Sequence, residues 1–542
     1  MMLLALLLGA VPARAADWQW SVPLTDIASS ENNDHPRAFL WIPPGCQRVR
    51  AVVVGQHNME EEPILEHPKF REAMAKLGIA EIWITPALDL FFRFDKGAGE
   101  HFNAMMAALA EESGYRELKF APVIPMGHSA AASFPWNFAA WNPERTLAVL
   151  SVSGQWPYYK DTNTPDWGNR LVDDIPGLVS MGDYEGAAGR AEVGLRQRQE
   201  HPRLALTMLA NPAAGHFDAS DEKIAFLALY ISKAAAYRLP ADAPLDHPVV
   251  LKPVDPTKQG WLVDRWRPDN PPKFPAAAVG SYTGDKKDAF WCFDGEIAHA
   301  IETFGSQYRG KKADLVGYVQ AGGIAPQNPN LHAQVNLKFE PGPDGLTFKL
   351  TGAFLDTVPP GRPEGWTGLK AGSPIAHVTD GSPIVISRIC GPVAQVGPDT
   401  FAIRFYRMGM NNTKRSNEIW LAATHPGDAQ YKRAVQQSVL HFPLRNTVGA
   451  EQRITFPKIA DQRASVKTLT LAATSSARVP VYYYVREGPA EFTGDNTLTL
   501  TAIPPRAKFP VKVTVVAWQW GRSIDPKLKT AEPVEQTFLL TR

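Results

Sequence analysis

A serine stands among small residues in the segment Gly-His-Ser-Ala-Ala at positions 127–131. The apolar run before it, residues 120–126, is typical of a buried strand, and the alanine-rich sequence after it is typical of a helix. Ser129 can therefore be a nucleophile on a sharp strand-to-helix turn, where Gly127 and Ala131 let strand and helix approach. It can also be an ordinary helix N-cap, a position that serine favours. A base and an acid further along the chain would favour the nucleophile.

His216 is the candidate base. A serine hydroxyl is a weak nucleophile at neutral pH, so a neutral imidazole must accept its proton during the attack. His216 follows the strand-like run 204–209 and precedes the helical segment 221–237. Lone histidines are more often structural than catalytic. This one occupies the place expected for a chain order of serine, acid and histidine.

Two carboxylates compete for the role of the acid that orients the histidine. The apolar run ending in Gly182 is followed by Asp183 and Glu185. We expect Glu185 to hold the imidazole and stabilise its protonated form, with Asp183 as the alternative. The contrary interpretation is that both are solvated turn residues at a strand end.

The negative charge that develops on the carbonyl oxygen of an ester requires preorganised N–H donors. The backbone N–H of Ala130, directly after the nucleophile, is the first expected donor. The second is expected from the loop Gly-Gln-His-Asn-Met at 55–59, which follows a strand over 50–54. We favour the amide of Asn58 or Met59.

Substrate contacts are expected from side chains near Ser129. A long aromatic segment over 155–167, a candidate lid, follows the strand-like run 147–152, and aromatic rings can stack on sugars or on an aromatic acyl group. The alternative is that these rings pack the lid onto the sheet. The candidates are Trp136, Trp156, Tyr158 and His128.

Metal and cofactor chemistry is not predicted. The run Glu60-Glu61-Glu62 beside His57 lacks the His-Glu-x-x-His spacing of a zinc site, so we interpret it as a solvated loop. No phosphate-binding or dinucleotide-binding motif occurs. Cys46, Cys292 and Cys390 are far apart and contain no Cys-x-x-Cys pair, so the chain holds either one disulfide or three buried free thiols.

The composition and the pattern of strands and helices predict the domains that position these residues. The chain has 542 residues, of which 44% are hydrophobic, and 56 basic against 55 acidic side chains give no electrostatic case for a nucleic-acid partner. Strand and helix patterns alternate over 37–239, which predicts a mostly parallel sheet covered on both faces. We expect a catalytic domain over 16–244, a β-rich region of unknown role over 245–447, and an antiparallel sandwich over 448–542.

The N-terminus has the features of an export signal. Residues 1–11 are apolar but too short to span a bilayer, and Ala13-Arg14-Ala15 fits a cleavage site. We therefore expect a leader over 1–15 and a secreted or periplasmic protein, with association with the cell surface as a further option. No Lys or Arg precedes the apolar run. The alternative is an ordinary buried N-terminal segment. No later stretch is long and apolar enough to span a membrane.

Two resemblances complete the interpretation. The segments "PMGHSAA" and "PERTLAVLSVSG" resemble secreted bacterial α/β-hydrolases of the esterase kind, and "ITFP" with "GPAEFTGDNTLTLT" resembles a bacterial immunoglobulin-like module. The first resemblance implies a secreted serine esterase, and we expect it to act on acetyl, feruloyl or methyl esters of a polysaccharide. A lipase, polyesterase or peptidase of the same fold is the alternative. A non-catalytic glycan-binding or adhesion protein is the alternative from another class.

Overall fold

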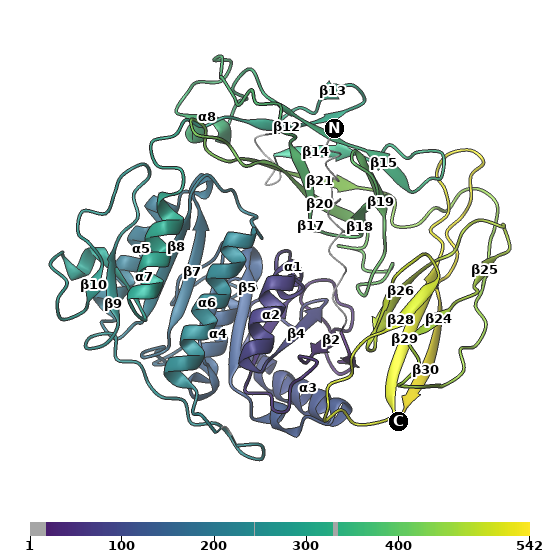
Figure 1. Cartoon of the computed structure of the whole chain (residues 1–542), viewed down its shortest axis with the longest axis horizontal. Helices are drawn as coiled ribbons and strands as arrows, with labels where there is room; N and C mark the ends of the chain where they lie inside the picture. The colour runs from purple at the N-terminus through teal and green to yellow at the C-terminus, as the bar shows by residue number, and fades with distance from the viewer. Residues whose placement is uncertain (1–17, 243, 329–333) are drawn as a thin grey trace, which may run out of the picture.

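The computed structural model describes residues 18–242, 244–328 and 334–542 (Figure 1). The predicted leader over 1–15 lies outside the described residues. Of the described helices, none is both long and apolar enough to cross a membrane.

The N-terminal part of the chain forms an eight-stranded sheet in the order β1-β2-β4-β3-β5-β6-β7-β8. The strands are β1 (Trp20–Pro23), β2 (Arg37–Trp41), β3 (Ala51–Gln56), β4 (Ile79–Thr85), β5 (Val123–His128), β6 (Val149–Val152), β7 (Gly177–Gly182) and β8 (Leu206–Asn211). The strands from β4 to β8 in this order pair in parallel, whereas β1 and β2 are antiparallel additions at one edge. The predicted mostly parallel α/β sheet is confirmed.

Helices cover both faces of this sheet. They are α1 (Glu61–Leu65), α2 (Pro68–Leu77), α3 (Ala98–Ser113), α4 (Phe134–Trp141), α5 (Ala187–Glu200) and α6 (Asp221–Arg238). Side chains alternate across β3, so that Val53 packs into the core under α2 and α6 while Val52 and Val54 pack into the core under α3. Every residue of β3, β5, β7 and β8 is buried, as expected of a parallel sheet covered on both sides.

The core of the large sheet continues beyond residue 244. A small antiparallel sheet and one helix pack against β8, and the Thr207 hydroxyl on β8 donates a 2.7 Å hydrogen bond to the carbonyl of Trp291. These elements are β9 (Trp261–Asp264), β10 (Ala277–Ala278), β11 (Ala289–Cys292) and α7 (Gly295–Ser306). Residues 261–306 therefore share the apolar core of the large sheet, although the sequence places them in the β-rich region.

The β-rich region proper holds three small sheets that share an apolar core and one short helix, α8 (Arg362–Thr367). The strands are β12 (Val316–Gln320), β13 (Gly323–Ile324), β14 (Val335–Lys338), β15 (Thr347–Lys349), β16 (Thr351–Phe354), β17 (Val385–Cys390), β18 (Val393–Gln395), β19 (Thr400–Ile403), β20 (Glu418–His425) and β21 (Ala434–His441). In Figure 1 these sheets lie at the top, and α8 contacts the turn that follows β7.

The C-terminal part consists of a four-stranded sheet, a three-stranded sheet and a two-stranded pair. The strands are β22 (Ile454–Thr455), β23 (Gln462–Arg463), β24 (Thr468–Thr470), β25 (Thr474–Ser475), β26 (Tyr482–Glu487), β27 (Ala490–Phe492), β28 (Thr497–Leu500), β29 (Val511–Trp518) and β30 (Val534–Thr541). Leu498 of the smaller sheet and Val513 of the larger belong to one core, so the two sheets face each other. The immunoglobulin-like assignment stays a prediction.

Side chains of the C-terminal part also fasten it to the large sheet. Arg506 forms an ion pair with buried Glu117 at 2.8 Å, and its backbone N–H donates to the hydroxyl of Tyr115 at 3.2 Å. Elsewhere, Cys46, Cys292 and Cys390 are all buried free thiols, which is one of the two arrangements that the sequence left open.

Candidate active site

Ser129 stands on a strained turn at the end of β5. It begins a short 3₁₀ turn (Ser129–Ala131), and its φ of +54° lies in the left-handed region that non-glycine residues rarely adopt. A Cβ at Gly127 would lie only 2.1 Å from the carbonyl oxygen of Ala131, so the turn requires glycine there. The residue that precedes α4 is Ser133, which rules out the N-cap interpretation of Ser129. Such local strain concentrates at functional sites.

His216 and Glu185 come together from two loops on the same edge of the sheet. His216 lies after β8, and Glu185 closes a 3₁₀ turn (Asp183–Glu185) directly after β7. The Glu185 carboxylate is 2.5 Å from Nδ1 of His216. Asp183 does not make this contact; burial raises its pKa, and a backbone hydrogen bond from Ala213 opposes the rise. Of the two predicted acids, Glu185 is the one placed against the histidine.

The three side chains share a cavity of about 720 Å³, which we call the Ser129 cavity. The lining residues are Ser129, Ala130, Ser153, Gln155, Met181, Asp183, Tyr184, Glu185, Gly186, Arg190, His216, Arg362, Gly365 and Trp366. An imidazole held at Nδ1 by a carboxylate can accept a hydroxyl proton at its other nitrogen. The arrangement has the groups needed for nucleophilic attack by Ser129 on a carbonyl carbon.

Two of the predicted substrate contacts are core residues instead. Trp136 is buried, donates a 2.8 Å hydrogen bond to the carbonyl of Gln155, and fills the space that a Cβ at Gly177 would occupy. Trp156 is buried and stacks on Phe290 of β11, with ring centroids 6.0 Å apart. The predicted contacts at Trp136 and Trp156 are wrong because these rings pack the segment after β6 onto the sheet.

The other two predicted contacts also lie off the cavity wall. Tyr158 stacks on His201 at 4.0 Å and lines a separate cavity of about 300 Å³. His128 is fully buried behind His216, with ring centroids 4.7 Å apart and its Nε2 3.1 Å from the His216 carbonyl oxygen. His128 therefore supports the histidine loop from behind, and neither residue is placed to touch a ligand beside Ser129.

The backbone amides predicted as the second oxyanion donor already donate hydrogen bonds to a buried carboxylate. Glu61 accepts hydrogen bonds from the backbone N–H of Met59 at 2.8 Å, of Asn58 at 3.2 Å and of His128 at 2.6 Å. Neither Asn58 nor Met59 lines the Ser129 cavity, so this geometry does not support them as the second donor. Ala130, the predicted first donor, does line it.

The run Glu60–Glu62 is not the solvated loop that the sequence indicates. All three glutamates are buried. Lys223 lies 3.4 Å from Glu60, and Arg388 of β17 lies 3.0 Å from Glu62. Burial raises the pKa of Glu61 to about 7, while its backbone hydrogen bonds limit the rise. The prediction was wrong because partners distant in sequence make this burial tolerable.

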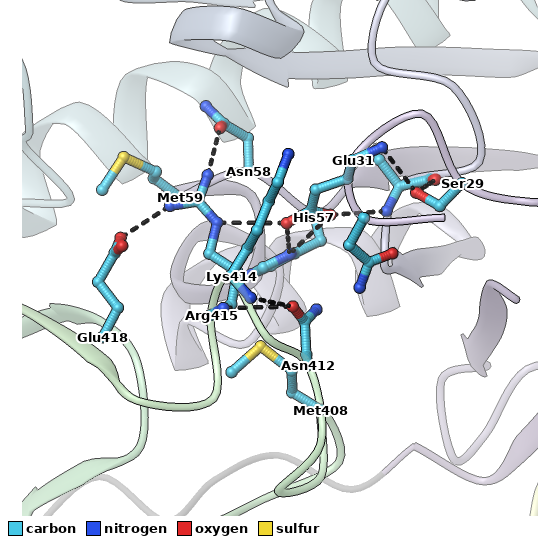
Figure 2. A network of polar contacts seen from close by, with 12 residues as sticks. Ser29, Glu31, His57, Asn58, Met59, Met408, Asn412, Lys414, Arg415 and Glu418 are labelled. Atoms are coloured by element: carbon cyan, nitrogen blue, oxygen red, sulfur yellow. Dashed lines mark hydrogen bonds and ion pairs between the residues drawn. The ribbon is translucent and has the colours of Figure 1, made fainter. Parts of the chain in front are cut away.

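The loop after β3 is tied to the β-rich region by the network in Figure 2. The Glu31 carboxylate contacts Nδ1 of His57 at 3.4 Å and accepts from Nε of Arg415 at 3.2 Å. Arg415 also donates to the side-chain oxygen of Asn58 at 3.3 Å. Burial raises the pKa of Glu31, but hydrogen bonds from His57 and the Ala87 amide, with the charge of Arg415, outweigh it and bring the pKa to about 2.

Sequence reasoning missed the contribution of α8 to the cavity. The Trp366 ring stacks on Tyr184 at 4.7 Å, and its Nε1–H donates to the Tyr184 carbonyl at 3.2 Å. Arg362 brings Nη1 within 3.8 Å of the Glu185 carboxylate. No sequence motif marks these residues, and they come from a segment more than a hundred residues after the histidine loop.

No family model matches the chain. No curated protein matches it either. Among solved structures, the chain is similar to a dienelactone hydrolase from Anabaena variabilis (17% identity, 40% of this chain and 96% of that one, TM-score 0.28). It is also similar to Est1E from Butyrivibrio proteoclasticus (13%, 40% and 99%, TM-score 0.27) and to a poly(3-hydroxybutyrate) depolymerase from Bordetella parapertussis (14%, 41% and 89%, TM-score 0.26).

The fold assignment stands on this chain's own geometry. The sheet order, the helices on both faces and the strained serine at the carboxyl end of β5 belong together in one architecture. The N-terminal part of the chain has the fold of an α/β hydrolase, followed by sheets that are mostly antiparallel.

Proposed function

We propose that this protein is a serine hydrolase that cleaves carboxylic esters, with Ser129 as nucleophile, His216 as base and Glu185 as the orienting acid. One observation carries the proposal. A serine in left-handed conformation shares a cavity with a histidine whose Nδ1 lies 2.5 Å from a carboxylate.

The reaction follows from these positions. The Ser129 hydroxyl oxygen attacks the ester carbonyl carbon while His216 takes its proton, and the Ala130 amide stabilises the oxyanion. The tetrahedral intermediate then expels the alcohol, which leaves with the proton from His216. Water, deprotonated in turn by His216, attacks the acyl-enzyme and releases the acid.

For the substrate we propose an acetyl, feruloyl or methyl ester on a polysaccharide. The Tyr184–Trp366 pair offers an aromatic surface at the cavity, on which a sugar ring or an aromatic acyl group can stack. The apolar residues 1–11 with the Ala-x-Ala site favour export, which would bring the enzyme to such polymers.

The test is turnover of 4-nitrophenyl acetate. We expect hydrolysis by the wild-type protein and a loss of at least about 10³-fold in Ser129→Ala. Ser133→Ala, four residues along at the start of α4, is the matched control and should retain activity. A panel of acetylated, feruloylated and methyl-esterified glycans then identifies the bond.

Other outcomes favour the alternatives. Faster release from triglycerides or synthetic polyesters than from glycans indicates a lipase or polyesterase, and cleavage of peptide bonds indicates a peptidase. Absence of all turnover together with binding of insoluble polysaccharide indicates an adhesion protein.

A further inference from the structure

We propose that the Ser129 cavity selects esters that carry a carboxylate, with Arg190 as its principal counter-charge. This inference rests on the proposed function and adds a substrate class to it. Arg190 lies in the first turns of α5 and lines the cavity together with Ser129 and His216.

The partners of Arg190 are neutral. Its Nη2 donates to the carbonyl of Gly154 at 2.9 Å and to the side-chain oxygen of Gln155 at 3.3 Å. Its Nε is buried and has no hydrogen-bond acceptor among the residues that the structure describes. Within the same residues, no carboxylate lies at ion-pair distance from Arg190. The guanidinium is thus held in place by two neutral oxygens, without a carboxylate partner among the described residues.

The carboxylates of the cavity are engaged elsewhere. Glu185 contacts His216 at 2.5 Å and Arg362 at 3.8 Å. Asp183 accepts from the Ala213 amide and is influenced by the charge of Lys432. Neither carboxylate is paired with Arg190, so an incoming anion would meet a free counter-charge there.

Arg362 adds a second guanidinium to the wall. Its side chain is 38% exposed, so it can turn toward a ligand at little cost. Guanidinium groups bind planar carboxylates through paired hydrogen bonds, and such charge-assisted bonds are stronger than neutral ones.

The carboxylate can reside in either part of the ester. It can belong to the alcohol, as in an ester of a uronic acid sugar, or to the acyl group, as in a half-ester of a dicarboxylic acid. Two matched substrate pairs separate these sources. Mono-4-nitrophenyl glutarate against 4-nitrophenyl valerate tests the acyl side, and 3-carboxy-4-nitrophenyl acetate against 4-nitrophenyl acetate tests the alcohol side.

We expect the wild-type protein to prefer the charged member of one pair by about tenfold or more in kcat/KM, after correction for intrinsic ester reactivity. Arg190→Gln should remove most of this preference, and Arg190→Lys should retain part of it. Arg170→Gln is the matched control, because Arg170 lines the separate cavity beside Tyr158 and should leave the preference unchanged. Circular dichroism and melting temperature confirm that each variant is folded.

A binding measurement keeps this inference distinct from the proposed function. Ser129→Ala protein is titrated calorimetrically with sodium glutarate, sodium glucuronate and neutral glucose, which needs no turnover. The inference is supported, even if no ester is hydrolysed, when either carboxylate binds to the Ser129→Ala protein and does not bind to the double variant that also carries Arg190→Gln. The inference is overturned if neither carboxylate binds and neither pair shows a preference, or if Arg190→Gln leaves the preference or binding unchanged.

Discussion

The Ser129 cavity has two walls that reach it by different routes. One wall is the carboxyl edge of the large sheet, where β5, β7 and β8 end in the turns that carry Ser129, Glu185 and His216. The other is α8 of the β-rich region, a six-residue helix of which only Pro363 is buried. The first wall is fixed by strands buried along their whole length, whereas in the second the half-buried Trp366 packs against a small apolar cluster of the β-rich region.

The difference in construction implies a difference in role. Groups that must be positioned to within fractions of an ångström for chemistry sit on the rigid sheet edge. Trp366 sits on a segment whose described contacts with the sheet edge include a ring stack and one hydrogen bond to Tyr184. Changes in the sheet wall should therefore lower kcat, and changes in the α8 wall should mainly raise KM.

The largest effect should come from the acid of the sheet wall. Glu185→Gln keeps the shape but removes the charge that contacts Nδ1 of His216, so we expect kcat to fall by about 10³-fold. Asp183→Asn, two residues away on the same turn, is the matched control and should change kcat by less than about fivefold. Steady-state kinetics on 4-nitrophenyl acetate measure both. Equal losses would remove the distinction between the two carboxylates.

A smaller effect should come from Glu31, whose contacts with His57 and Arg415 join the large-sheet part of the chain to the β-rich region. Glu31→Gln should lower the free energy of unfolding by about 3 kcal/mol at pH 7, because the pKa of Glu31 falls from 4.5 to about 2 on folding. Stability from a depressed pKa is present above pH 4.5 and is lost as the pH falls toward 2. The difference from wild type should therefore shrink steadily below pH 4.5 and nearly vanish only at about pH 2 and below.

Chemical denaturation at several pH values measures this effect. Glu72→Gln is the control, because the exposed pair of Glu72 with Lys76 contributes little to stability at any pH. A pH-independent loss in Glu31→Gln would show that packing, rather than the charge contacts with Arg415 and His57, fastens the regions.

The smallest effect should come from the α8 wall. Trp366→Ala removes the ring that stacks on Tyr184, so we expect about a tenfold rise in KM for methyl ferulate and a smaller one for ethyl acetate. Leu369→Ala, an exposed residue just after α8, is the control. Kinetics on the two esters measure the change. A fall in kcat equal for both esters would instead place Trp366 with the sheet wall.

Local patterns predicted the sheet wall because its geometry is local. A strand, a small residue, Ser129 and a helix follow one another in sequence, and parallel strands present their carboxyl ends at one edge, which brings Glu185 and His216 nearby. The sheet is confirmed, and the structure places these three residues together; their catalytic roles stay a prediction.

Long-range packing explains what the sequence did not reveal. Trp136 is a core residue because Gly177, far along the chain, leaves room for its ring. Glu62 is buried because Arg388 of the β-rich region reaches it. The contact between Trp366 and Tyr184 depends on how two regions dock, which no periodicity records.

The most direct test of the account is covalent labelling of the nucleophile. The protein is incubated with a fluorophosphonate, digested, and analysed by mass spectrometry. We predict one adduct, on the peptide containing Ser129, that forms more slowly in His216→Ala and is absent in Ser129→Ala. An adduct on another serine, or no adduct on the folded wild-type protein, would contradict the assignment of Ser129 as the nucleophile.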